Sequence, residues 1–309
     1  MANKINNTNK FAIMVDTGCD LPQELMAEYG IETLPITFNL NGTEHTKGYW
    51  QETSAKEFYD ALRNGGIAKT AQINPDAFAA LFTEYAKQGR DLLFITLSSG
   101  LSGTYQSSQI ALQEVKEAYP DCNIYTVDSI SATVGIGLLA DLAAKKRSAG
   151  FTAGETAAWL EEKKHSCIGL FTVDDLMYLH RGGRLGKLSA IAGSVLKVKP
   201  LLNLTPTGTL AVKDKARGRK AALALLTEQF KRSIKPETAL DTVYITHTDC
   251  RDEADELAEM LKSAANIQNV RVVMMGPVIG AHVGPGALIV LFEGDMTRDE
   301  YEAAFYGAK

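Results

Sequence analysis

Residues 92–106 read LLFITLSSGLSGTYQ and indicate the fold class most directly. The first six residues are almost all apolar, and such a short run before a glycine-containing loop is typical of a buried strand. Residues 104–118 continue with the apolar spacing of a helix. A strand that leads through a loop of serines and glycines into a helix predicts an α/β protein with a parallel sheet.

The rest of the first half repeats this alternation of strands and helices. Residues 11–15 are apolar and end at Asp16, as expected of a buried strand, and Asp20 could cap the helix that follows. Asn41-Gly42 is a hairpin-type turn dipeptide. Further strands are predicted at 31–40 and 123–127, helices at 54–64, 76–88 and 133–150, and a loop at 69–75. The first half is therefore predicted to be a doubly wound α/β domain.

The second half predicts a second α/β domain with a different arrangement. Strands are predicted at 166–172, 201–204, 209–212, 242–246, 270–275 and 287–292, and helices at 173–180, 189–198, 219–230 and 252–265. Residues 272–292 lack charged side chains but contain prolines, glycines and a histidine, so we interpret them as strand, glycine loop and strand rather than a membrane span. Charge accumulates at 162–165, which predicts domains at 1–164 and 165–309.

Composition narrows the class of partner. The 309 residues carry 32 basic and 37 acidic side chains, a net charge of −5 without a long basic run, so nucleic-acid binding is not expected. Residues 1–10 are polar and lack the apolar segment of a secretory signal, which predicts a cytoplasmic protein. The cysteines have no paired spacing, which predicts neither a zinc site nor a disulfide framework. They are Cys19, Cys122, Cys167 and Cys250.

Four loops after predicted strands are candidates for a binding site, because open parallel sheets bind ligands outside the carboxyl ends of their strands. They are residues 16–21, 98–106, 128–131 and 276–286. Loop 98–106 combines hydroxyls and glycines just before a helix, an arrangement that can hold a carboxylate or phosphate. The same hydroxyls could instead only cap helix 104–118.

His282 lies in an uncharged, glycine-rich segment and is expected to be partly buried. A lone histidine in such a place is often a structural group, but a histidine held by a glycine-rich loop can also donate to an anion. Arg184 and Arg217 stand beside glycines and could bind anions or simply be solvated. No phosphate-binding, zinc-protease or hydrolase-elbow motif is present.

Six motifs together resemble the bacterial DegV family of fatty-acid-binding proteins. They follow the family's order and span nearly the whole chain, at residues 16–22, 69–72, 97–107, 127–129, 179–185 and 280–286. The resemblance implies two domains that hold one long-chain fatty acid between them in an internal tunnel. It also implies presentation of the carboxylate to a separate fatty acid kinase, for phospholipid synthesis. The protein would then be a carrier subunit without a cofactor or metal, and not an enzyme.

The resemblance also assigns residues to this site. Carried over by motif, the carboxylate ligands are Thr70, one of Ser98 and Ser99, and His282, with Arg184 close by and Arg217 in contact with the kinase. The chain departs from the family pattern at Ala71-Gln72 and at Ala281, which removes possible secondary hydroxyls and leaves the main ligands.

A fatty acid would be held mainly through its tail. Each buried methylene contributes roughly 0.8 kcal/mol, so fifteen or so give on the order of 12 kcal/mol before ordering costs. The buried carboxylate needs hydrogen-bond donors, which hydroxyls and an imidazole supply. Aliphatic residues of the second half could line the tunnel, namely Ile191, Val195, Leu196 and Leu201.

Two other functions remain open from the sequence. A hydrolase acting on an acyl ester would use Ser98 or Ser99 as nucleophile and His282 as base. Asp16 or Asp128 would then orient the imidazole. A sugar or dihydroxyacetone kinase component is suggested only by general similarity of fold.

Overall fold

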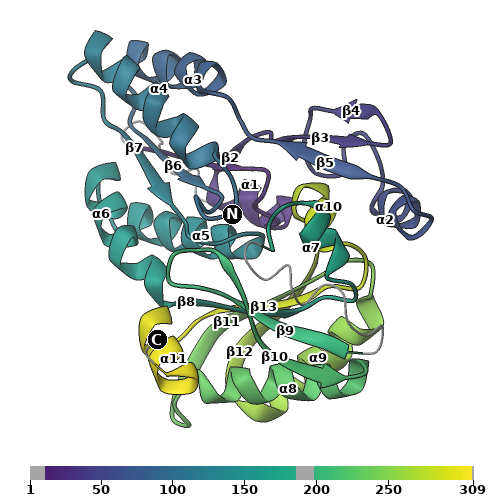
Figure 1. The fold of residues 1–309 in the computed structure, drawn as a ribbon. Coiled ribbons are helices and arrows are strands. Elements are labelled where there is room, and N and C mark those ends of the chain that lie inside the picture. The colour runs from purple at the N-terminus through teal and green to yellow at the C-terminus, as the bar shows by residue number, and fades with distance from the viewer. Residues whose placement is uncertain (1–10, 186–197, 308–309) are drawn as a thin grey trace, which may run out of the picture.

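The computed structural model describes residues 11–185 and 198–307 and contains two large sheets with helices between them (Figure 1). The first sheet is parallel, in the order β2-β1-β6-β7. Its strands are β1 (Ala12–Asp16), β2 (Ile31–Leu34), β6 (Leu92–Thr96) and β7 (Ile124–Asp128). Helices cover both faces, so the predicted doubly wound first half is confirmed. They are α1 (Gln23–Tyr29), α3 (Pro75–Lys87), α4 (Thr104–Ala118), α5 (Val134–Ser148) and α6 (Ala153–Lys163).

The second sheet has six strands in the order β10-β9-β8-β13-β11-β12. They are β8 (Cys167–Thr172), β9 (Val198–Leu204), β10 (Leu210–Arg217), β11 (Ala239–His247), β12 (Asn266–Met274) and β13 (Leu288–Glu293). Only β11 and β12 pair in parallel; the other neighbours are antiparallel. The outer face is covered by α8 (Arg219–Arg232) and α9 (Arg251–Ala264), and α11 (Arg298–Tyr306) lies near the C-terminus. The predicted second α/β unit is therefore present.

Helix α5 of the first half packs against β8 and β13 of the second sheet as well as against β1 and β6. This explains why α5 is buried along most of its length although it has no clear apolar stripe. The two halves share this helix layer, and their division into domains 1–164 and 165–309 stays a prediction.

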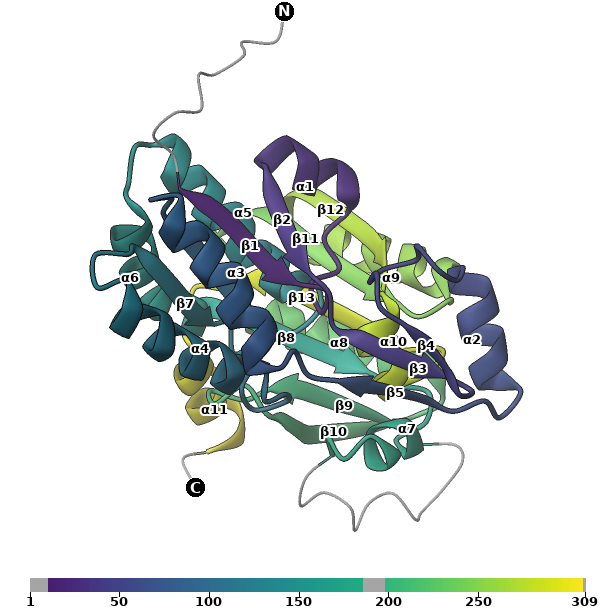
Figure 2. The same cartoon turned by 90° about the horizontal axis from the view of Figure 1, so that it is seen from above.

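A small third sheet departs from the predicted strand at 31–40. The chain leaves the first sheet at Pro35, which has no N–H for the ladder. It continues as β3 (Thr37–Leu40), which pairs with β4 (Thr43–His45) through the predicted Asn41-Gly42 turn. The predicted loop 69–75 begins as β5 (Ala68–Ala71), on the other edge of β3. Figure 2 shows this small sheet lying beside α10 (Pro277–Val283), which it contacts.

The structure differs from several other predictions about helices. The glycine loop predicted within 272–292 contains helix α10, with Pro277 in its first turn, where a missing N–H costs nothing. The predicted helix 173–180 is the shorter α7 (Met177–Arg181), and helix α2 (Ala55–Arg63) agrees with the prediction. Asp20 does not cap α1, because no side chain caps that helix. The predicted helix at 189–198 lies almost wholly outside the described residues, as do Ile191, Val195 and Leu196.

Strand alternation in the second sheet separates two cores. Leu202 and Leu204 face the core shared with α5, whereas Leu201 belongs to the core under α8 and α9. The prediction that Leu201 lines the tunnel is therefore wrong, because it points to the opposite face of the sheet.

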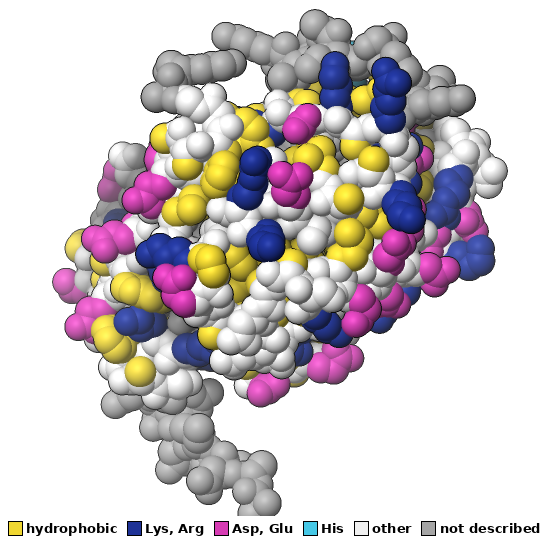
Figure 3. Space-filling view, turned by 90° about the horizontal axis from the view of Figure 1, so that it is seen from below, with side chains coloured by type: hydrophobic (Ala, Val, Ile, Leu, Met, Phe, Trp, Pro, Cys, Tyr) yellow, Lys and Arg dark blue, Asp and Glu magenta, His cyan; other side chains and the backbone are white. Residues whose placement is uncertain are grey.

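Figure 3 shows the molecule from below, where positive and negative side chains are interspersed, so this face has no continuous basic surface for a nucleic acid. Within residues 11–185 and 198–307, no helix is both long and apolar enough to cross a membrane.

Candidate functional site

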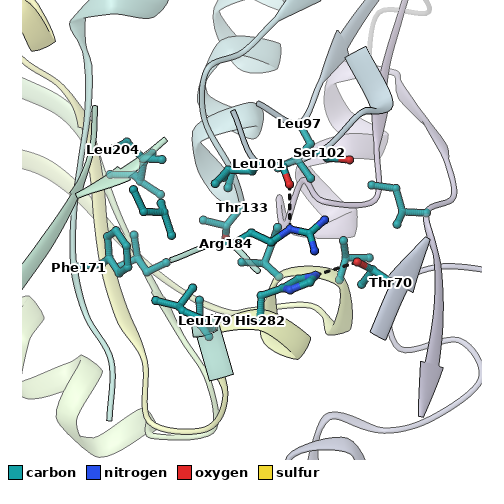
Figure 4. A pocket seen from close by; sticks show the side chains of 18 of the residues that line it. Thr70, Leu97, Leu101, Ser102, Thr133, Phe171, Leu179, Arg184, Leu204 and His282 are labelled. Carbon is teal, nitrogen blue, oxygen red and sulfur yellow. Dashed lines mark hydrogen bonds between the residues drawn. The ribbon is translucent and has the colours of Figure 1, made fainter. Parts of the chain in front are cut away.

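An apolar cavity lies between the first sheet and the inner face of the second (Figure 4). Its volume is about 730 Å³, including the part that opens to solvent, which is within the usual range for small-molecule sites. The second sheet, α10 and the loop after β6 supply most of the apolar wall. These side chains are Phe171, Leu204, Ile289, Leu291, Val278, Ile279, Val283, Leu97 and Leu101.

The polar lining side chains concentrate at one end of the cavity. Thr70 of β5 and His282 of α10 are hydrogen-bonded, with 2.8 Å between Thr70 Oγ1 and His282 Nε2. Arg184, which follows α7, lies beside them, whereas Phe171 and Leu204 lie away from this pair (Figure 4). The cavity is therefore amphipathic, with an apolar interior and a polar end.

The His282 imidazole is neutral near pH 7. Burial and the positive charge of Arg184 lower the pKa of His282 from 6.5 to about 4. Nδ1 is buried and has no hydrogen-bond partner among the described residues. Because a buried N–H without an acceptor is costly, the favoured tautomer carries its proton on Nε2. Nε2–H then donates to Thr70 Oγ1, which leaves the Thr70 hydroxyl free to donate to a ligand.

Gly182 explains why His282 can sit so close to the backbone. A methyl group at position 182 would collide with His282 Nδ1. The glycine of the Arg-Gly-Gly-Arg motif thus permits this packing.

Arg184 brings a positive charge to the polar end of the cavity. Its Nε donates to the Leu101 carbonyl at 3.0 Å and its Nη1 to the Gly182 carbonyl at 2.5 Å, so its orientation is fixed. Burial lowers the pKa of Arg184 from its ordinary value. No carboxylate in the described parts of the chain pairs with it. A half-buried cation without a counter-charge favours an anionic ligand.

The polar end also faces a second hollow, which we call the outer cleft. It is about 960 Å³ including open solvent, and its lining includes Thr70, Arg184 and His282, all of which also line the cavity. Lys69 and Arg181 add two exposed cations to its wall. An anion bound at the polar end is therefore adjacent to a basic, solvent-open cleft.

The predicted serines lie near the cavity but not in its wall. Ser98 is fully buried, and its hydroxyl donates to the Gly208 carbonyl at 2.8 Å and accepts from the Gly100 N–H at 3.1 Å. Ser99 is exposed. Ser102 lines the cavity instead.

Sequence reasoning missed Gln72, Ser102 and Thr133, which also line the cavity. For Ser102 the signal was its place two residues before α4, in a loop already chosen as a candidate site. Arg217 is exposed at the end of β10 and lines neither the cavity nor the outer cleft.

The contacts do not assemble a hydrolase constellation within the described residues. Asp16 accepts from the N–H groups of Leu97 and Gly18, and burial raises its pKa to about 6. Asp128 accepts from backbone N–H groups of Ser99 and Ile130. His282 is hydrogen-bonded to Thr70 rather than to a serine or a carboxylate. The same part of the chain contains no cluster of three metal-ligating side chains.

The fold and the site together define a two-sheet α/β protein whose apolar cavity ends in a position suited to an anion. A family model described as "Uncharacterised protein, DegV family" matches residues 10–295, and the chain belongs to this family. A DegV domain-containing protein of Clostridium perfringens is 39% identical over 287 residues, which cover 93% of this chain and 98% of the relative.

Solved structures of the family have the same fold. A Thermotoga maritima protein with fatty acid binding function is 30% identical, with a TM-score of 0.80 and coverage of 92% of this chain and 99% of that one. A fatty-acid-binding DegV family protein of Thermus thermophilus is 28% identical, with a TM-score of 0.81 and coverage of 92% and 100%.

Proposed function

We propose that this protein binds one long-chain fatty acid, with the acyl chain in the cavity and the carboxylate at Thr70, His282 and Arg184. One observation carries the proposal: the apolar cavity ends at Arg184, which pairs with no carboxylate of the described residues, and at a neutral hydroxyl–imidazole pair. This arrangement matches a molecule with a long apolar tail and one anionic end. The fatty acid binding of the two solved relatives supports it.

The hydrogen-bond directions at the polar end suit a carboxylate. The Thr70 hydroxyl, which accepts from His282, has its own proton available for a carboxylate oxygen. Arg184 contributes charge while its Nε and Nη1 remain engaged with carbonyls, which limits its own reach. The second carboxylate oxygen can then face the outer cleft.

We propose that this oxygen is presented to a separate fatty acid kinase in the cytoplasm, and that this protein is the carrier subunit. In that reaction the carboxylate oxygen attacks the γ-phosphorus of ATP, an acyl phosphate forms and ADP leaves. The exposed cations Lys69 and Arg181 of the outer cleft would attract the phosphates, and Arg217 would contact the kinase. The kinase role rests on the family resemblance.

Mass spectrometry of the natively purified protein tests the first step. A copurified long-chain fatty acid, retained less well by His282→Ala and Thr70→Val, is expected because each variant removes part of the carboxylate site. The proposal would be contradicted if the purified protein contained no lipid and failed to rebind oleate after delipidation. Hydrolysis of acyl esters by the same protein would favour the hydrolase.

A coupled assay tests the second step. Delipidated protein reloaded with oleate is mixed with ATP and a bacterial fatty acid kinase catalytic subunit, and acyl phosphate is trapped as a hydroxamate. The carrier role is supported if acyl phosphate forms only when this protein is present. It is supported further if Lys69→Glu or Arg217→Glu lowers the amount of product and leaves oleate binding unchanged. Oleate binding without any product would restrict the function to storage or transport.

A further inference from the structure

One peptide group at the start of α10 is held from both sides by residues of the first half. The Met275 carbonyl accepts a hydrogen bond of 2.7 Å from the Tyr59 hydroxyl. The Gly276 N–H, which belongs to the same peptide bond, donates to Asp20 Oδ1 at 2.8 Å. Tyr59 lies on α2 and Asp20 follows β1, so side chains from two distant segments are hydrogen-bonded to the same peptide group.

This contact is buried and tightly packed. Tyr59 is fully buried and Asp20 is 3% exposed. A methyl group at Gly276 would collide with the Asp20 carboxylate, and one at Gly280 would collide with the Tyr59 hydroxyl. Gly276, the residue before α10, and Gly280, within it, are therefore required by the two side chains that hold the helix.

Helix α10 depends on such contacts because it has only seven residues. An isolated helix of this length is unstable in water, since the cost of nucleation is not recovered over so few hydrogen bonds. His282 lies in its last turn, one residue before the end of the helix at Val283. A change in the direction of the helix at Gly276 would therefore move the imidazole relative to Thr70.

We propose that Tyr59 and Asp20 are positioning residues that clamp the 275–276 peptide group and thereby hold His282 against Thr70. Neither residue lines the cavity, so they act through α10 and not by touching the ligand. The inference deepens the proposed function, because it identifies what keeps the hydroxyl–imidazole pair in place in a site built from both halves of the chain.

The chemistry of Asp20 fits this role. Burial and the neighbouring Asp16 charge raise the pKa of Asp20 to about 7, and the nearby Thr133 hydroxyl opposes this rise. The contact with Gly276 needs only an acceptor oxygen, which a carboxylate, a carboxylic acid or an amide can each supply. The conservative change Asp20→Asn is therefore expected to preserve the clamp, whereas Asp20→Ala removes it.

An NMR titration of the His282 imidazole in the lipid-free full-length protein tests the clamp without any ligand. The wild type is expected to titrate with a pKa of about 4. Tyr59→Phe and Asp20→Ala are each expected to move this pKa upward, toward the ordinary value of 6.5, because a displaced imidazole gains solvent. Asp20→Asn is expected to titrate like the wild type.

Tyr301→Phe is the matched control. Tyr301 is also buried, and its hydroxyl donates to Gln229 at 3.2 Å, but it lies on α11 away from α10. This variant should lose thermal stability to a similar extent as Tyr59→Phe, since each loses one buried hydrogen bond, and keep the pKa of His282 unchanged.

The dissociation rate of bound oleate provides the second measurement. We expect it to rise about five- to tenfold in Tyr59→Phe and Asp20→Ala and to stay unchanged in Asp20→Asn and Tyr301→Phe. If Tyr59→Phe and Asp20→Ala lose only thermal stability and His282 still titrates as in the wild type, the clamp is wrong. If the wild type binds no oleate, the proposed function fails, and the NMR titration still decides about the clamp.

Discussion

Ser98 and Thr70 are both hydroxyl side chains that the family resemblance places at the carboxylate, but their surroundings differ. The Ser98 hydroxyl uses its proton on the Gly208 carbonyl and accepts from Gly100, so its capacity is committed within the protein. The Thr70 hydroxyl accepts from His282 and keeps its proton. The comparison teaches that a buried hydroxyl indicates a binding site only when the fold leaves part of its hydrogen-bonding capacity unused.

The largest expected effect concerns pH, where the polar end of the cavity and the acidic loop after β1 should behave in opposite ways. His282 has a folded pKa of about 4, below the 6.5 expected when unfolded, so the stability it contributes is present above pH 6.5 and lost as the pH falls through 4. Asp16 and Asp20 have folded pKa values of about 6 and about 7, so their contribution is present below pH 3.8 and lost as the pH rises through these values.

Urea unfolding between pH 4 and 7 measures this contrast. Relative to His282→Gln, the wild type should gain up to about 3 kcal/mol as the pH rises from 4 to 7. Relative to Asp20→Asn, it should lose stability over the same range. Parallel curves for the wild type and His282→Gln would show that the imidazole is not held in its buried neutral form.

Removing the positive charge should have the next largest effect on binding. Arg184→Leu is expected to weaken oleate binding about 30-fold, because a hydrogen-bonded charge contributes roughly 2 kcal/mol. Displacement of a fluorescent fatty acid gives the dissociation constants. Arg251→Leu, on the exposed surface of α9, is the control and should bind as the wild type does. Equal affinities for Arg184→Leu and the control would place the carboxylate elsewhere.

The two hydroxyls can be compared directly. Thr70→Val keeps the shape of the side chain and should weaken oleate binding about fivefold, since one donor to the carboxylate is lost. Ser98→Ala should leave the affinity unchanged and lower the free energy of unfolding by about 1 kcal/mol, since only an internal hydrogen bond is lost. The reverse result, with weaker binding by Ser98→Ala and unchanged binding by Thr70→Val, would show that Ser98 rather than Thr70 donates to the carboxylate.

The smallest expected effect is on chain length. Phe171 lines the cavity away from the polar end, so Phe171→Ala should shift the preference toward fatty acids a few carbons longer, at about 0.8 kcal/mol per added methylene. Phe292→Ala is the control, because Phe292 is a buried phenylalanine of the same sheet that faces the core under α8 and α9. Competition among saturated fatty acids of increasing length measures the preference, and an identical shift in both variants would assign it to general loosening of the core.

Most of the fold could be predicted, because hydrophobic periodicity and turn residues are local signals. Strands β1, β6 and β7 and the helices α1, α4 and α5 that follow them lie where the sequence predicts them, whereas the predicted strand 31–40 is divided and α6 was not predicted. The break at Pro35 could have been foreseen from proline chemistry. Helix α10 was missed because glycine and proline in its sequence favour a loop, and contacts with Tyr59 and Asp20 override that preference.

The candidate site was only partly predictable. The motif resemblance pointed to Thr70, His282 and Arg184, which the structure brings together at the end of one cavity. It also pointed to Ser98 and Ser99, which the structure keeps out of the cavity wall. Motif position does not show which way a side chain points, and a change of one position in the loop before α4 separates a buried serine from an exposed one.

By itself the sequence determined the α/β class, the order of most of its elements and the residue types available for an anion, since these follow from local patterns along the chain. Only the tertiary structure decided that Thr70 is hydrogen-bonded to His282, 212 positions further along the chain, and that the Ser98 hydroxyl donates to the Gly208 carbonyl. The physical reason is that the free energy of a buried polar group depends on its three-dimensional neighbours, which distant segments supply when they pack together.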